Sequence, residues 1–209
     1  MSNQLIWSDL HLSHVNLATK WRTWAGGTVE DHNDMIAERW NDAVRPHDEV
    51  WLIGDACMGK LVESLPLIKA LHGTKHLVPG NHDRVHPSYH HKTPEAAEKF
   101  RAMYAEVFTI HPPKVLGKDI GLDDRTLICH FPWAGTADHA ESDREHLAQY
   151  SPKREDYPVG TVLVHGHTHS SQIYGDMSVH VGVDTFPEGP IPLDTLQLLI
   201  NGARKNGGK

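Results

Sequence analysis

The chain has 209 residues, of which 39% are hydrophobic and 22% are charged, and its formal net charge is −7. This length and composition are typical of one globular domain, and the acidic charge disfavours extended nucleic acid as a partner. There is no leader pattern and no stretch of membrane-spanning length, and the cysteines at 57 and 129 form no disulfide framework. We therefore expect a cytoplasmic protein without a membrane partner.

In chain order, the hydrophobic pattern predicts a strand over 4–8, a helix over 29–44, a strand over 49–55, a helix over 60–72 and a strand over 75–83. A helix over 94–106 begins at a proline, and further strands are predicted over 107–110, 125–130, 161–166, 177–184 and 195–200. This alternation, followed by a run of strands, predicts an α/β (α+β) fold in which two mixed sheets pack as a sandwich flanked by helices.

The predicted domain organisation is simple. One domain covers 1–200, and residues 201–209 are expected to be a flexible C-terminal tail. Residues 132–158 are polar and rich in charge and proline, which predicts an insertion near the active site, with one short helix, that shapes specificity.

Acidic, amide and imidazole side chains repeatedly follow the predicted strands, where sheet-based enzymes gather their sites. Because residues i and i+2 of an extended segment point to one side, such pairs are expected to converge. Mixed oxygen and nitrogen ligands suit manganese, iron or zinc, and seven candidates are too many for one tetrahedral ion. They fit two ions that share a carboxylate: the candidates are Asp9, His11, Asp55, Asn81, His130, His167 and His169.

The candidates lie in five ordered blocks, DLH (9–11), GD (54–55), GNHD (80–83), the histidine at 130 and GHTH (166–169). This series resembles the calcineurin-like metallophosphoesterase superfamily, and in particular its small single-domain phage and bacterial members. The segment 180–196 is also similar to the C-terminal pattern of the family. The resemblance implies a four-layer αββα fold and two divalent ions, with Mn²⁺ expected first and Fe or Zn as alternatives.

The resemblance also implies a role for each block. Asp9, His11 and His169 would bind one metal, Asn81, His130 and His167 the other, and Asp55 would bridge them. His82 would meet the phosphate and the leaving group, and Asp83 would hydrogen-bond His82 and orient it. One departure is Met58, which stands where many members carry a second acidic residue.

The implied activity is hydrolysis of small phosphodiesters by metal-activated water, with 2′,3′-cyclic nucleotides among the expected substrates. A phosphomonoesterase or protein phosphatase and a nuclease on the same site are the alternatives. A non-enzymatic scaffold is disfavoured because every implied ligand is present. The oligomeric state is left open.

Three further residues lie close to these blocks. His14 is a candidate for substrate contact by its position after DLH, with a surface role as the alternative. Arg84 follows GNHD and either contacts phosphate or has a structural or solvated role. His165 precedes GHTH, but we expect a strand-end or supporting residue, because Gly166 interrupts strand alternation before His167.

Overall fold

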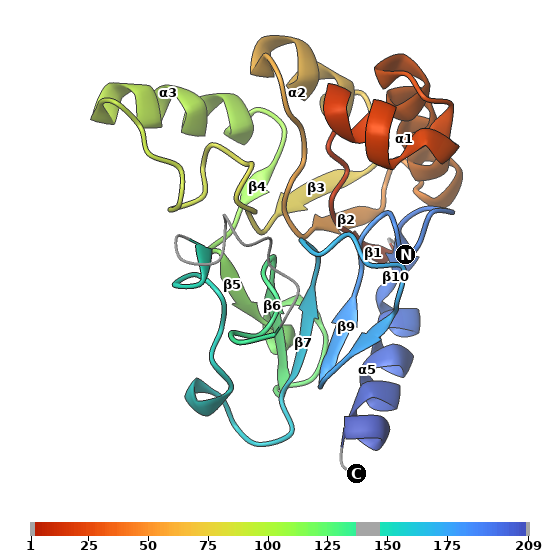
Figure 1. The fold of residues 1–209 in the computed structure, drawn as a ribbon, viewed down its shortest axis with the longest axis vertical. Coiled ribbons are helices and arrows are strands. Elements are labelled where there is room, and N and C mark those ends of the chain that lie inside the picture. The colour runs from red at the N-terminus through yellow and green to blue at the C-terminus, as the bar shows by residue number, and fades with distance from the viewer. Residues whose placement is uncertain (1–2, 137–146, 208–209) are drawn as a thin grey trace.

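The structure is a computed structural model that describes residues 3–136 and 147–207 (Figure 1). It contains two five-stranded mixed sheets. The first has the order β10-β1-β2-β3-β4, where β1 to β4 are parallel and β10 is antiparallel; their bounds are Ile191–Pro192, Gln4–Trp7, Glu49–Leu52, Thr74–Leu77 and Thr109–Ile110. The second has the order β5-β6-β7-β9-β8, with antiparallel β5 and β8 at its edges; their bounds are Lys114–Leu116, Thr126–Cys129, Val162–His165, Ser178–His180 and Tyr174–Gly175.

Helices flank the sheets. Figure 1 shows α1, α2 and α3 grouped on one side of the first sheet and α5 alongside β9; their bounds are Val29–Ala43, Leu61–Lys69, Pro94–Ala105 and Leu193–Gly207. Short helical turns cover Leu17–Trp21 (η1), Thr23–Ala25 (η2), Gly117–Ile120 (η3) and Arg154–Asp156 (η4). In the described part of the chain, no helix is both long enough and apolar enough to cross a membrane.

Strand alternation divides the apolar residues of the first sheet between two cores. Leu5 and Trp7 of β1 pack in the cluster that includes α1, α2 and α3 residues, whereas Ile6 packs in the cluster shared with the second sheet. A third cluster contains Leu127 and Leu163 of the second sheet and residues that follow β6, such as Trp133. The predicted sandwich of two mixed sheets with flanking helices is therefore confirmed as a fold class.

The helices predicted over 29–44 and 94–106 are present, and each is preceded by a capping threonine. The side chains of Thr28 and Thr93 accept hydrogen bonds from the backbone N–H groups of Asp31 and Ala96. These side-chain caps satisfy donors that a helix start leaves without intrahelical partners. The helix predicted over 60–72 is shorter in the structure, where α2 covers Leu61–Lys69.

The predictions for the C-terminus are wrong. Residues 195–200 do not form a strand and 201–207 are not a free tail, because α5 covers Leu193–Gly207; 208–209 lie outside the described residues. Its buried side chains recur at helical spacing and pack between the sheets, whereas Leu198 is 72% exposed; the buried ones are Leu193, Leu196, Ile200 and Ala203. Arg204 also forms an ion pair with Asp123 at 2.6 Å. The short apolar run 195–200 is ambiguous on its own, and the helical period shows only over the longer segment.

The predicted insertion over 132–158 is described only in part, since 137–146 lie outside the described residues. Its described ends contain η4 and contribute Trp133 and Leu147 to the third apolar cluster. The strand predicted over 177–184 is shorter, but the chain beyond it remains ordered. There Gly182 forms a parallel bridge with Ser8, which follows β1, so the two sheets meet where the candidate ligands lie.

Candidate metal centre

Left-handed backbone turns bring the candidate ligands together. The φ angles are 61° at Asp9, 48° at His11, 56° at Asp55, 70° at His167 and 51° at His169. Residues with side chains adopt this region rarely and at a cost, and such positions cluster at functional sites. The extended i, i+2 geometry assumed from the sequence is therefore wrong, because sharp turns after the strands produce the convergence.

Two compact groups of ligand atoms result. The first donor group is Asp9, His11 and His169, and the second donor group is Asp55, His130 and His167; within each, the ligand atoms lie within 4.8 Å of one another. Asn81 adjoins the second donor group, since its Oδ1 lies 3.2 Å from His130 Nε2 and 3.0 Å from His167 Nδ1. This division agrees with the two sets expected from the sequence.

Asp55 lies between the groups. Its Oδ2 is 3.5 Å from His11 Nε2 and 3.2 Å from His130 Nε2. Burial alone would raise the pKa of Asp55, but the charges of His130 and His82 hold it well below its usual range. Burial lowers the pKa of His130, whereas its contact with Asp55 raises it to about 9 overall. One ionised carboxylate therefore faces donors of both groups.

The imidazoles are oriented by their other nitrogen. His130 Nδ1–H donates to the backbone carbonyl of Ile53 at 2.8 Å, which turns Nε2 toward Asp55. His169 Nδ1–H donates to Asp184 at 2.9 Å. Burial lowers the pKa of His11 well below its usual value, which favours the neutral imidazole, and both of its ring nitrogens are buried without a hydrogen-bond partner. An unpartnered nitrogen of a neutral imidazole can accept a metal ion, and His11 Nε2 faces Asp55; unlike His130 and His169, His11 has no partner that orients its other nitrogen.

Glycines permit the close approach of these loops. A Cβ on Gly80 would lie 2.3 Å from Asp55 Oδ1, and a Cβ on Gly166 would lie 2.3 Å from Asp9 Oδ2. Both distances are far inside van der Waals contact, so a larger residue would displace a candidate ligand. The glycines of the GNHD and GHTH blocks are therefore explained by packing.

The expected role of Asp83 is wrong. Its buried carboxylate accepts backbone N–H bonds from Gly80 and Asp55 at 2.8 Å and from Ala56 at 3.0 Å. Within the described structure, no hydrogen bond joins it to His82. Burial and the charge of Asp55 raise the pKa of Asp83 to about 6. Asp83 thus fixes the two loops that carry Asp55 and Asn81, and the motif spacing could not distinguish this from a contact with the next residue.

His82 and His14 lie beside the first donor group. The ring centroids of His82 and His14 are 5.3 Å and 5.4 Å from that of His11. His82 Nε2 is 4.0 Å from Asp55 Oδ2, and His82 is partly exposed. The His82 backbone N–H donates to Asp55 Oδ1 at 2.9 Å. Both histidines therefore border the donor groups without belonging to them.

Arg84 is engaged away from the donor groups. Its guanidinium lies 4.6 Å from the ring centroid of Phe100 and donates to the carbonyl of Gly59 at 3.3 Å. It lines a small cavity together with Asn81 and His82. These contacts fit the structural alternative of the sequence analysis better than direct phosphate contact.

Arg22 is a buried residue of the site that the sequence pattern did not identify. Its side chain is 1% exposed and binds both oxygens of Asp184, at 3.0 and 2.6 Å. It also donates to the carbonyl of Asp9 at 2.8 Å and lies 3.3 Å from His169 Nδ1. Of the pair Arg22 and Asp184, only Asp184 lies in a stretch with a sequence signal, the segment 180–196. Arg22 thus supports the first donor group through its contacts with Asp9, His169 and Asp184.

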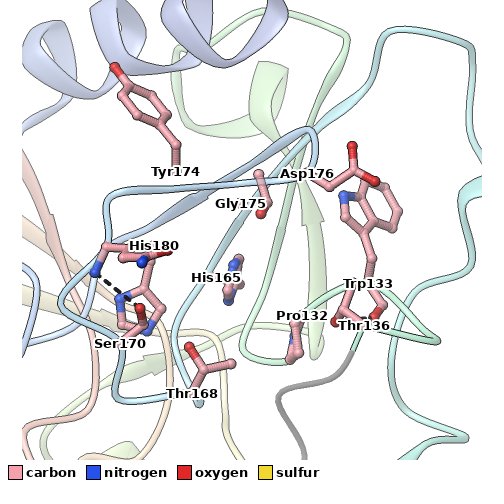
Figure 2. Close-up of a pocket in the computed structure, with 12 residues that line it drawn as sticks. Pro132, Trp133, Thr136, His165, Thr168, Ser170, Tyr174, Gly175, Asp176 and His180 are labelled. Atoms are coloured by element: carbon pink, nitrogen blue, oxygen red, sulfur yellow. Dashed lines mark hydrogen bonds between the residues drawn. The ribbon is translucent and has the colours of Figure 1, made fainter. Parts of the chain in front are cut away.

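An open cavity of about 460 Å³ adjoins both donor groups, and its walls include Trp21, Arg22, His82 and Asp184. A second cavity of about 80 Å³ shares only Thr168 with the first (Figure 2). His165 and His180 lie on the wall of this second cavity, with ring centroids 5.2 Å apart. His165 belongs to neither donor group of the described residues, in agreement with the sequence expectation.

Fold and site together define a mixed α/β protein with two adjoining groups of metal-type donors. No protein-family model matches the chain. The chain is 33% identical to the Gene 66 protein of Mycobacterium phage D29, over 96% of this chain and 97% of that protein. It is 34% identical to the Gene 66 protein of Mycobacterium phage L5, over 100% and 99% of the two chains. The chain therefore belongs to the family of these Gene 66 proteins.

Two more distant proteins are similar over nearly the whole chain. An uncharacterized protein of Methanocaldococcus jannaschii is 26% identical over 92% of this chain and 88% of that protein. The crystal structure of a protein of unknown function from Aquifex aeolicus matches with a TM-score of 0.61 at 19% identity, over 96% of this chain and 100% of that one. The second likeness is a likeness of fold.

Proposed function

We propose that the protein is a member of the calcineurin-like metallophosphoesterase superfamily that hydrolyses small phosphodiesters with two divalent metal ions. The observation that carries this proposal is the position of Asp55. Its Oδ2 lies 3.5 Å from an imidazole of the first donor group and 3.2 Å from one of the second. A carboxylate shared between two donor groups is what a dinuclear site requires.

The donor chemistry fits such ions. Carboxylate, amide and imidazole donors suit Mn²⁺, our first choice, and also Fe or Zn. Asp9, His11 and His169 would hold one ion, and Asn81, His130 and His167 the other, with Asp55 on both. The unpartnered Nε2 of His11, which faces Asp55, supports this assignment, because buried polar atoms are rarely left without a partner.

The reaction requires stabilisation of phosphoryl charge and protonation of the leaving oxygen. When bound, the metal pair would neutralise phosphoryl charge and activate water for in-line attack. His82 would hold a proton at Nε2 for the leaving oxygen, since it is partly exposed on the cavity wall. The backbone N–H of His82 is tied to Asp55, which keeps this imidazole beside the donor groups.

Two observations support a small phosphodiester as the substrate. The alkoxide of a diester is a poor leaving group, so an acid at the position of His82 has most to contribute there. The cavity of about 460 Å³ and the net charge of −7 suit a small substrate better than a polymer. Cyclic nucleotides, including 2′,3′-cyclic ones, are therefore the first substrates to examine.

The test combines metal analysis with a substrate screen. We expect two manganese ions per chain after loading, and hydrolysis of aryl phosphodiesters and cyclic nucleotides above that of monoesters and single-stranded DNA. His167→Ala should lose metal, whereas His165→Ala, a matched histidine outside both donor groups, should keep it. A protein that binds no transition metal and is inert with added manganese would refute the proposal, and faster turnover of monoesters would favour the phosphatase alternative.

A further inference from the structure

An exposed indole lies at the edge of the candidate active-site cavity. Trp21 is 77% exposed and lines the cavity together with Leu17 of the same helical turn, η1. Trp24, three residues later, is 51% exposed but does not line this cavity. Large apolar side chains exposed beside a cavity often mark a binding surface. A bound ligand would explain why the Trp21 side chain is exposed at the cavity. Trp24, which is exposed but away from the cavity, serves as a control.

The backbone of Trp21 is held firmly although its side chain is exposed. The next residue, Arg22, is buried and bound to Asp184 and to the carbonyl of Asp9. The Arg22 backbone N–H closes the turn by donating to the carbonyl of Leu17 at 2.8 Å. Short π-type turns of this kind occur frequently at functional sites. The backbone that carries the indole is thus held in place next to Arg22, which limits the backbone entropy lost when a ligand binds.

The lining of the cavity combines two chemically different sets of residues. Asp55, Asn81 and the histidines of the GHTH block are polar and would receive a phosphoryl group. Leu17 and Trp21 add apolar and aromatic surface. A substrate that fills both must join a phosphate to a flat aromatic group over a short distance. A nucleotide has this composition, and nucleobases stack well on indole rings.

We propose that Trp21 is the stacking platform for the base of the substrate, so that the substrate class is a phosphodiester that carries a nucleobase. This inference rests on the proposed phosphodiesterase function and specifies its substrate. One lining indole stacks one base, which fits a mononucleotide diester better than a strand. Trp21 is a specificity-determining residue in this proposal and takes no part in bond breaking.

The kinetic test compares two diesters, 2′,3′-cyclic AMP and the same cyclic phosphate on 1-deoxyribose, which has no base. We expect Trp21→Ala to lower kcat/KM for the nucleotide about tenfold, mainly through KM, and to leave the base-free diester unchanged. Trp21→Phe should recover most of the loss, and Trp24→Ala should behave as the unmodified protein. An unchanged preference for the nucleotide in Trp21→Ala would overturn the proposal.

A binding test does not depend on turnover. Adenosine 3′-monophosphate should quench the tryptophan fluorescence of the unmodified protein and of Trp24→Ala, but not of Trp21→Ala, while inorganic phosphate should quench none of them. Equal quenching and equal affinity in Trp21→Ala would refute the platform. The two proposals fail separately: absence of hydrolysis with every diester refutes the phosphodiesterase, whereas hydrolysis without base preference refutes only the role of Trp21.

Discussion

The two donor groups are held by different kinds of contact. Behind the first donor group, His169 is oriented by Asp184, whose carboxylate is bound by the buried guanidinium of Arg22. In the second, His130 donates to a backbone carbonyl, and Asp83 fixes the adjoining loops through backbone N–H groups. The first therefore depends on a charged side chain from a distant segment, and the second mainly on the main chain. A substitution that weakens metal binding at the first donor group should therefore leave metal binding at the second unchanged.

Loss of the shared carboxylate of Asp55 should affect both donor groups equally, and it should reduce metal content more than any other change. We expect Asp55→Ala to release both proposed ions together, because Oδ2 faces donors of each group. Metal content after dialysis, measured by mass spectrometry, should fall from two ions per chain to nearly none. Asp42→Ala, an exposed aspartate on α1, is the control. Retention of one tightly bound ion would show that Asp55 serves only one group.

Loss of His82 should leave both groups intact. We expect His82→Ala to keep its metal and to reduce diesterase turnover by about 10²–10⁴-fold, the usual contribution of a positioned acid. Metal analysis and initial rates on a cyclic nucleotide, whose alkoxide is a poor leaving group, measure the two effects. His47→Ala removes an exposed histidine outside the site and should change neither. Normal turnover in His82→Ala would exclude it as the acid.

Removal of Arg22 should affect the two groups unequally. We expect Arg22→Met to weaken metal binding at the first donor group by about 10–100-fold, as is usual when a residue that orients a ligand is lost, and to spare the second. Competition with a chelator resolves the two affinities. Equal weakening of both ions would contradict the proposed division of support.

Two controls separate this effect from a general loss of stability. Arg22→Met leaves Asp184 partly buried without its cation, which can cost about 3–5 kcal/mol of folding free energy. The double variant Arg22→Met/Asp184→Leu removes both charges and should recover stability but not the affinity of the first ion. Arg39→Met breaks an exposed pair with Glu188 and should alter neither property.

The smallest expected effect concerns His32, which is buried beside Arg22. Burial and the charge of Arg22 lower the pKa of His32 to about 4. Since this folded-state pKa is below the ordinary value near 6.5, the folded protein binds fewer protons than the unfolded chain between pH 6.5 and 4. Stability from this group is therefore present above pH 6.5 and is lost as the pH falls. From pH 7 to 5.5 the loss should be about 1 kcal/mol.

Urea unfolding of the metal-free protein at the two pH values measures this loss. In His32→Gln the amide oxygen can still accept from Arg22, but the side chain does not titrate. The pH dependence of its unfolding free energy should be smaller by the same amount. An identical pH dependence in both proteins would mean that His32 does not titrate as its surroundings imply.

Much of the candidate site was predictable because its residues follow strands in short blocks. The seven donors were read from five motifs, the family resemblance implied their division into two sets, and parallel strands then bring the motifs to one edge. The left-handed turns were not predictable, because residues such as His167 have no intrinsic preference for that backbone region strong enough to reveal it. They depend on contacts made by the folded loops.

Other features depended on contacts between distant segments. Arg22 and Asp184 are 162 residues apart, and nothing in the sequence around Arg22 distinguishes it from a surface arginine. Asp83 was misassigned because a motif gives neighbours along the chain and not the direction of a carboxylate. The C-terminal helix was missed because six apolar-rich residues fit a strand or a helix, and only the positions of Ile200 and Ala203 decide between them.

The left-handed backbone at five proposed ligands also has a consequence for evolution in the laboratory. Each such residue costs roughly 1–2 kcal/mol relative to a right-handed conformation, and glycine would remove most of that cost. Selection for heat resistance alone, without selection for turnover, should therefore accept glycine at Asp9, His167 or similar positions. At these positions, a substitution that raises thermal stability would remove a proposed metal ligand.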